Sequence, residues 1–256
     1  MTVSTDASPP NAAAPSRRAR GRLVTAAIAS LSMVVAGEVL LRGCVGLGDP
    51  PLYARHPTIE YILRPGSYRP FGNDFHVNAA SMRSPDSATG PLSAGERRVL
   101  VLGDSIVCGG NSVPDGALAT TLLAESLGGG DGASRVSICN VSAGSWGPRN
   151  LLAYLEEHGT FGAEVAIVVL NSADWTDVPT FEDLGPDRPE RRPALALVEL
   201  CTRYLPRLIP FGAGERAPAD IGESVTAEAD IEALVGLLRA RGLRVAVVLH
   251  PAASEL

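Results

Sequence analysis

Apolar and amphipathic stretches alternate along the second half of the chain. Four short apolar runs, each long enough for a buried strand, are separated by stretches with the spacing of amphipathic helices. The runs span residues 99–102, 136–141, 165–170 and 245–249, and the helical stretches span 118–127, 150–158 and 226–241. Strands that alternate with helices form parallel βαβ units, so this pattern predicts an α/β domain with four parallel strands in one sheet.

A longer apolar stretch lies near the N-terminus. Residues 23–41 are mostly apolar or small, and a helix of that length reaches about 28 Å, close to the thickness of a bilayer core. The stretch predicts a single transmembrane helix. Residues 1–22 are rich in Ala, Ser and Pro and predict a disordered basic tail. Because four arginines precede the apolar stretch, we expect this tail in the cytoplasm and the main domain outside it.

Two alternatives to a permanent membrane anchor stay open. The basic flank also suits a cleaved secretory signal, although no convincing cleavage site of small residues follows the apolar stretch. Cys44 follows Leu41-Arg42-Gly43, which faintly resembles a lipoprotein site, but an arginine is a poor fit there. The anchor remains the interpretation that the length and flanking charges favour.

Residues 42–96 form a membrane-proximal segment before the main domain at 97–256. Pro and Gly interrupt regular structure here, and aromatic residues are frequent. We expect the segment to pack on the main domain, with one short strand at residues 75–78. A surface position is favoured for Arg83 over a contact with substrate.

Composition excludes some classes of function. The apolar fraction of 45% is enough for a buried core, and the net charge is −6 without a basic stripe outside the N-terminus. We therefore expect no nucleic-acid partner. The four cysteines lie far apart, with no Cys-x-x-Cys pair and no histidine at ligand spacing, so we expect no structural zinc site. The oligomeric state is not indicated.

Polar and small residues follow the strands at the edge where sites form in parallel sheets. Gly103-Asp104-Ser105 follows the first apolar run, and a serine where a buried strand breaks into a loop is a candidate nucleophile. Gly144 follows the second run, and its amide is approachable because no side chain intervenes. The amides of Ser105 and Gly144 would together form an oxyanion hole.

Three blocks of sequence resemble the SGNH (GDSL-type) hydrolases. They are Leu102-Gly103-Asp104-Ser105, residues 140–147, and Asn171-Ser172-Ala173-Asp174. The resemblance implies a flavodoxin-like three-layer sandwich, chemistry on acyl esters, and neither a metal nor another cofactor. It also implies Ser105 as nucleophile, Asp104 as the neighbour that shapes its loop, and Gly144 as oxyanion donor. Membrane-anchored members often act on acylated polysaccharides, so by analogy we expect an acyl-ester or acylated-carbohydrate substrate.

Two positions depart from the family pattern. Ala173 stands where the family has an asparagine that donates to the oxyanion, and Asn171 is the nearest substitute, with Asp174 following. The chain has no Asp-x-x-His, the block that supplies the general base, and it ends at Leu256 soon after the fourth run. We therefore expect a C-terminally truncated sheet with an exposed apolar edge. His250 is the best-placed replacement base, because it ends the last strand.

Five residues near the expected site have more than one interpretation. Cys108 is read as a packing residue rather than a nucleophile. Trp146 and Trp175 would either form a wall for sugar or acyl groups or pack against the Pro-rich excursion at 177–218. Asp174 and Asp177 are expected to be solvated or capping carboxylates rather than metal ligands.

Two hypotheses about function follow. The first is a membrane-anchored hydrolase or acyltransferase that uses Ser105. The second is an SGNH-like domain without catalytic activity, either a binding module or a fragment. The missing general base separates them, because an unassisted serine hydroxyl is a weak nucleophile at neutral pH.

Overall fold

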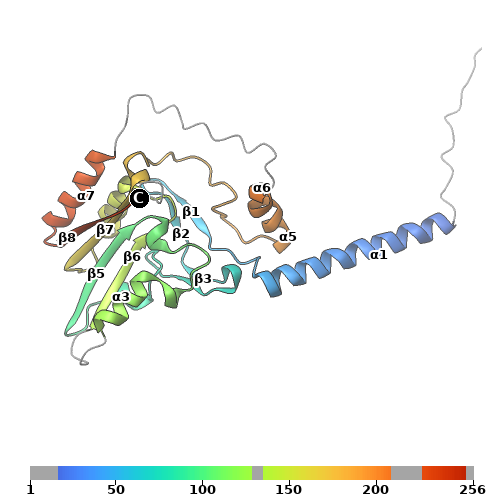
Figure 1. Ribbon diagram of the computed structural model, residues 1–256, viewed down its shortest axis with the longest axis horizontal. Coiled ribbons are helices and arrows are strands. Elements are labelled where there is room, and N and C mark those ends of the chain that lie inside the picture. The colour runs from blue at the N-terminus through green and yellow to red at the C-terminus, as the bar shows by residue number, and fades with distance from the viewer. Residues whose placement is uncertain (1–16, 129–134, 209–226, 252–256) are drawn as a thin grey trace, which may run out of the picture.

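A four-stranded parallel sheet forms the centre of the molecule (Figure 1). The computed structural model describes residues 17–128, 135–208 and 227–251. The strands lie side by side in the order β6-β5-β7-β8, and every neighbouring pair is parallel. Their bounds are β5 Glu96–Gly103, β6 Arg135–Ser142, β7 Val165–Asn171 and β8 Arg244–His250. The predicted α/β class and parallel sheet are confirmed, and all four apolar runs are strands of that sheet.

Helices cover both faces of the sheet. α3 (Ala119–Gly128) packs on one face, while α4 (Pro148–His158) and α7 (Glu228–Ala240) pack together on the other. Side chains of a strand alternate between faces, so Leu100 joins the α4 and α7 core and its neighbour Val101 joins the smaller α3 core. The three helical stretches expected between the strands are therefore present.

Two small antiparallel hairpins precede the sheet. β1 (Tyr53–His56) pairs with β2 (Glu60–Leu63), and β3 (Gly66–Tyr68) pairs with β4 (Phe75–Val77). Their buried aromatic and aliphatic side chains belong to the same core cluster as the central strands. Short helical turns connect the elements: η2 Pro70–Gly72, η3 Asp86–Thr89, α2 Ser105–Cys108, η4 Asp115–Ala117 and η5 Ser172–Trp175.

One helix of the described part is long and apolar enough to cross a membrane. α1 spans Arg17–Leu40 and continues through a π-helical turn, η1 (Leu41–Val45), to Gly46. The candidate span, Arg20–Val45, has 26 residues, or about 39 Å of helix, and is not buried by the rest of the protein. The helix begins earlier than expected, because arginine and alanine favour helix and extend it back to Arg17. Residues 1–16 of the expected tail lie outside the described residues.

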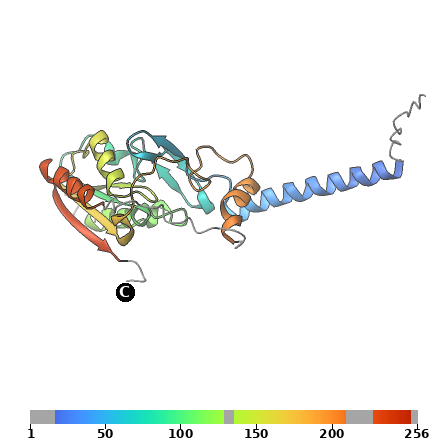
Figure 2. The same cartoon turned by 90° about the horizontal axis from the view of Figure 1, so that it is seen from above.

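The Pro-rich excursion contains a helix that the sequence did not predict. α5 (Ala196–Glu199), η6 (Leu200–Tyr204) and α6 (Leu205–Leu208) follow one another without a break. We call residues 196–208 the docked helix, because they lie against the C-terminal end of α1 (Figure 2). Residues 209–226 lie outside the described residues.

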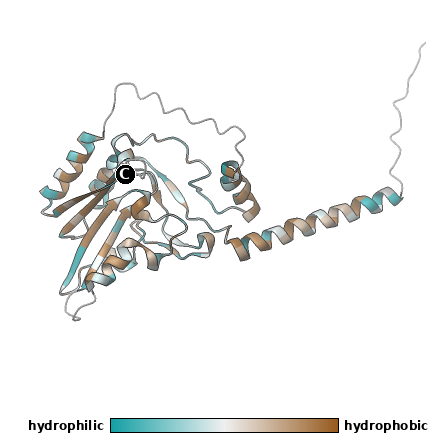
Figure 3. Ribbon diagram, in the orientation of Figure 1, coloured by the Kyte–Doolittle hydropathy of each residue, from teal (hydrophilic) through white to brown (hydrophobic). Residues whose placement is uncertain are grey.

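β8 forms an apolar edge of the sheet. Val247, Val248 and Leu249 are all exposed, and Figure 3 shows the apolar colour of this strand. Within the described ranges, β8 pairs with β7 alone. An exposed apolar edge matches the expectation from the sequence, and such edges favour association with other chains.

Candidate functional site

Ser105 lies at the carboxyl end of β5, in a tight turn between a strand and a short helix. It is the exposed first residue of α2, directly after Asp104. The turn requires glycine at 103, since a Cβ there would lie 2.5 Å from Val107 Cγ2 and 3.2 Å from the Val169 carbonyl oxygen. The sharp turn presents the serine hydroxyl at the edge of the sheet.

The carboxylate of Asp104 organises this turn. Its Oδ1 accepts a hydrogen bond of 2.9 Å from the backbone N–H of Ile106, which caps α2. Its Oδ2 accepts one of 2.8 Å from Asn171 Nδ2 and a longer contact of 3.4 Å from Ser105 Oγ. The acceptor that the structure provides for the serine hydroxyl is therefore a carboxylate with other partners.

Asn171 and Asp174 form the neighbouring part of the site at the end of β7. The backbone N–H of Asn171 donates to Asp174 Oδ2 at 2.7 Å, and the N–H of Ala173 donates to Asn171 Oδ1 at 2.7 Å. Asn171 thus reaches the serine turn, but its amide donates to Asp104. The expected capping role of Asp174 is confirmed, since its carboxylate caps η5, but the side chain is buried rather than solvated. Burial, with the nearby Asp104 charge, raises the pKa of Asp174 to about 6.

Gly144 lies two residues beyond β6, whose last residue Ser142 pairs with Gly103 of β5. The Gly144 loop and the serine turn therefore follow adjacent strand ends. Tyr61 Oη donates to the Gly144 carbonyl oxygen, and Arg188 Nη2 lies 3.5 Å from the same atom. The Arg188 guanidinium also stacks 4.3 Å from the centre of the Tyr61 ring. No local pattern predicted Arg188, because it arrives from the excursion.

Arg83 is a residue whose role the sequence reading missed. We expected it at the surface, but only 2% of it is exposed. Its Nε donates to Asp115 Oδ1 at 2.9 Å, and its other nitrogens donate to three carbonyl oxygens of residues 108–113. The expectation was wrong because acceptors far along the chain satisfy the buried cation. Arg83 therefore fixes the loop that follows Ser105.

Asn140 holds α2 from the other side. This fully buried β6 residue donates from Nδ2 to the Val107 carbonyl oxygen at 3.0 Å and to Thr120 Oγ1 at 3.2 Å. Ser142 Oγ donates to its Oδ1. The short helix that carries Ser105 is consequently supported by β6, by Arg83 and by its own Asp104 cap.

The structure does not bring His250 to the serine. His250 pairs in register with Asn171, and β7 separates β8 from β5, which corresponds to about 10 Å across two strand spacings. Within the described residues the side chain of His250 has no hydrogen-bond or ion-pair partner. The other histidines have partners elsewhere: His56 with Glu157, His76 with Asp86, and His158 against the Tyr154 ring. None of the four contacts Ser105.

The other residues singled out near the site are two tryptophans, Cys108 and Asp177, and they lie in different surroundings. Trp146 is buried and donates from Nε1 to the Tyr61 carbonyl oxygen at 3.0 Å, so it packs under the β2 hairpin, whereas Trp175 is exposed. Burial raises the pKa of the Cys108 thiol, which matches a packing residue. Burial, with the nearby Glu60 charge, raises the pKa of Asp177 to about 6.

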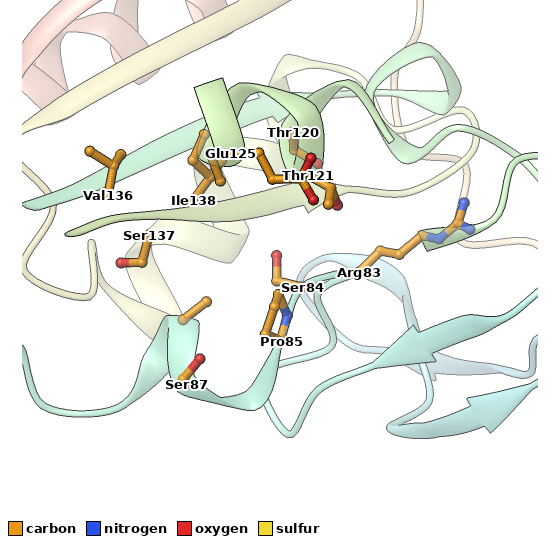
Figure 4. Close-up of a pocket in the computed structure, with 12 residues that line it drawn as sticks. Arg83, Ser84, Pro85, Ser87, Thr120, Thr121, Glu125, Val136, Ser137 and Ile138 are labelled. Atoms are coloured by element: carbon orange, nitrogen blue, oxygen red, sulfur yellow. The ribbon is translucent and has the colours of Figure 1, made fainter. Parts of the chain in front are cut away.

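A cavity of about 210 Å³ lies along the β6 edge rather than at the serine (Figure 4). Ser84, Thr120 and Ser137 line it among other residues, and Ser105 does not. In the described ranges no group of three or more His, Cys, Asp or Glu side chains is placed to hold a metal ion.

Comparison with known proteins assigns no family to the chain. No protein-family model matches the sequence, and no curated protein matches it. The candidate site therefore stands on its geometry: an exposed serine at the end of a central parallel strand, held by Asp104, Asn171, Asn140 and Arg83.

Proposed function

We propose that this protein is a membrane-anchored serine hydrolase or acyltransferase of the SGNH type that acts on acyl esters, including those of acylated carbohydrates. The strand order supports a flavodoxin-like sheet, in which the first strand has the second on one side and the third on the other. Helices on both faces support the three-layer arrangement.

The position of Ser105 is the observation that carries the proposal. Ligands of open α/β sheets bind outside the carboxyl ends of the strands, where the strand order reverses. In this sheet that point lies at the ends of β5 and β7, where Ser105 is exposed and Asn171 is bonded to Asp104. An exposed hydroxyl at this point is accessible to a bound ester.

The proposed reaction begins when Ser105 Oγ attacks the ester carbonyl carbon. The amides of Ser105 and Gly144 would stabilise the resulting oxyanion, while Asp104 Oδ2, 3.4 Å from Oγ, is the acceptor for the hydroxyl proton. The ester C–O bond then breaks, and the alkoxide takes the proton held by Asp104 and leaves as the alcohol. Water or a second alcohol next takes the acyl group from the serine, and its proton returns to Ser105 Oγ. Because a carboxylate is a weaker base than imidazole at neutral pH, we expect slow turnover.

The apolar helix supports an anchor in this proposal. Arg17, Arg18, Arg20 and Arg22 precede the apolar part of α1, which favours a cytoplasmic N-terminus and an α/β domain on the far side. A single-pass protein of this orientation would meet esters of the cell surface.

Hydrolysis of p-nitrophenyl acetate by the full chain tests the proposal. We expect Ser105→Ala to abolish the enzymatic part of the rate, and Ser87→Ala, an exposed serine on η3, to leave it unchanged. After subtraction of the reaction of imidazole with the ester in the absence of protein, added imidazole should raise the rate of the native chain but not of Ser105→Ala, because it can supply the missing base. Equal background rates for native and Ser105→Ala, with and without imidazole, would overturn the proposal.

A non-catalytic, ligand-binding SGNH-like domain is the second candidate. The observation that favours it is the placement of the histidines, since none in the described residues contacts Ser105. In that case an acylated carbohydrate would bind without turnover, and Ser105→Ala would retain its affinity.

A further inference from the structure

The docked helix exposes an apolar stripe. Val198 is 45% exposed and Leu208 is 74% exposed. Cys201 and Leu205 are exposed between them, and Leu195 is exposed directly before the helix, so exposed apolar residues recur every three or four positions from 195 to 208. That interval places these side chains on one side of a helix. Thr202, Pro206 and Arg207 are exposed beside this stripe.

The buried side of the same helix is charged. Glu199 and Arg203 are both buried, with Glu199 Oε1 3.6 Å from Arg203 Nη1. Glu199 Oε2 accepts from the Gly48 N–H at 2.6 Å, and Arg203 Nη2 donates to the Asp187 carbonyl oxygen at 3.0 Å. A helix on a water-soluble domain has the reverse arrangement, with its apolar side buried and its charges in water.

The docked helix begins on the candidate membrane span. The two carboxylate oxygens of Glu38 accept hydrogen bonds from the N–H groups of Ala196, at 2.8 Å, and Leu197, at 3.1 Å. The Leu197 side chain lies 3.8 Å from the place of a Cβ at Gly37. Glu38 and Gly37 belong to the candidate span Arg20–Val45. The start of the docked helix therefore lies at the same depth in the membrane as that part of α1.

We infer that the docked helix is a second membrane contact, which lies in the surface of the bilayer that α1 crosses with its apolar stripe among the lipid acyl chains. The inference rests on the membrane anchor of the proposed function, but not on the serine chemistry. Phe71, exposed and edge-on to Tyr204 at 5.5 Å, adds apolar surface beside the same helix. The contact would fix the orientation of the α/β domain on the membrane.

Cys201 permits a direct test. In a Cys44→Ser chain it is the remaining exposed cysteine, because Cys108 and Cys139 are buried. The full chain is labelled there with bimane and reconstituted in vesicles of phosphatidylcholine and phosphatidylglycerol that contain doxyl-labelled lipid. We expect quenching that places the probe about 5–10 Å into the headgroup and acyl boundary. The same label at Glu156→Cys on α4, with Cys44 and Cys201 replaced by serine, should not be quenched.

Matched substitutions test the stripe itself. Leu205→Gln should reduce quenching at Cys201, whereas Leu122→Gln, which changes an exposed leucine of α3, should leave it unchanged. Both positions are exposed, so neither change removes core packing. Equal quenching in the two variants would overturn the inference.

A probe in the span separates failure of the anchor from failure of the inference. Bimane at Ser30→Cys, in a chain whose exposed cysteines are serine, should be quenched by deep doxyl groups. If this probe is quenched and the Cys201 probe is not, the docked helix does not lie in the bilayer. A Cys201 probe with a blue-shifted emission that no lipid quenches would show contact with a second protein chain. If neither probe is quenched, the anchor and the inference both fail.

Discussion

Two helices of this chain bury opposite kinds of side chain. α4 buries Leu151, Tyr154 and Leu155 against the sheet and exposes Glu156 and Glu157. The docked helix buries Glu199 and Arg203 beside Ala196, and it exposes valine and leucine, with Arg207 as its one exposed charge. Helix formation itself does not distinguish them, since both arrangements satisfy the backbone hydrogen bonds. The two helices differ in the medium that they face, which is water for α4 and, in our proposal, lipid for the docked helix.

Removal of apolar volume from α4 should have the largest effect on stability. Leu155 is fully buried in the main core, so Leu155→Ala should lower the free energy of unfolding by about 2–5 kcal/mol. Urea unfolding of the full chain in detergent, followed by tryptophan fluorescence, measures this loss. A change below about 0.5 kcal/mol would mean that α4 is not packed as described.

A change of pH should act on the carboxyl edge of the sheet, where Asp174 is buried. Folded Asp174 keeps its proton up to a pH of about 6, whereas the unfolded chain loses it near 3.8. Its contribution is therefore fully present below pH 3.8 and is lost as the pH rises through about 6. Asp174→Asn should flatten this fall by on the order of 1 kcal/mol, after allowance for screening by solvent. Thermal unfolding between these pH values checks the sign, and a steeper fall in the variant would contradict it.

The junction of the docked helix with α1 should respond to loss of Glu38. Glu38→Ala removes the acceptor for the N–H groups of Ala196 and Leu197, whereas Glu38→Gln keeps an oxygen there. We expect several-fold faster hydrogen exchange of these two amides in the alanine variant and a smaller change in the glutamine variant. The exchange of α4 amides serves as the internal reference. Unchanged exchange at 196 and 197 would show that Glu38 does not hold the helix.

The smallest effect is expected on the exposed stripe. Leu205→Ala should change the free energy of unfolding in detergent by less than about 0.5 kcal/mol, since the side chain is 38% exposed and belongs to neither core cluster of the described residues. Leu155→Ala makes the same substitution in α4, so the difference between the two losses in the free energy of unfolding compares the two helices directly. A large loss for Leu205→Ala would place this leucine in a protein core.

Regular structure was largely predictable from the sequence. The apolar runs at 136–141 and 165–170 lie within β6 and β7, and the stretch 150–158 lies within α4, because periodicity reports which face of a local element is buried. The docked helix escaped the same reasoning. Its exposed side is apolar, and two prolines at 189 and 193 precede it, so its pattern resembled an irregular excursion.

The candidate site was predictable only in part. The position of Ser105 after a buried strand follows from local pattern, and so does the place of Asn171 at the end of the third strand. The hydrogen-bond partner of Asn171 could not be predicted from local pattern, because the bond to Asp104 joins residues at the ends of two different strands. Arg83 shows the same limit: a lone arginine in a turn reads as a surface residue until four acceptors surround it.

The sequence by itself determined the apolar helix, the βαβ order and the serine at a strand end, because each depends on neighbours along the chain. Tertiary structure alone decided which charges are buried and which leucines are exposed. Glu38 meets the docked helix, and Arg83 meets the serine loop, across long separations in sequence. Hydrogen bonds and burial are satisfied between residues that folding brings together, and local patterns carry no record of such pairs.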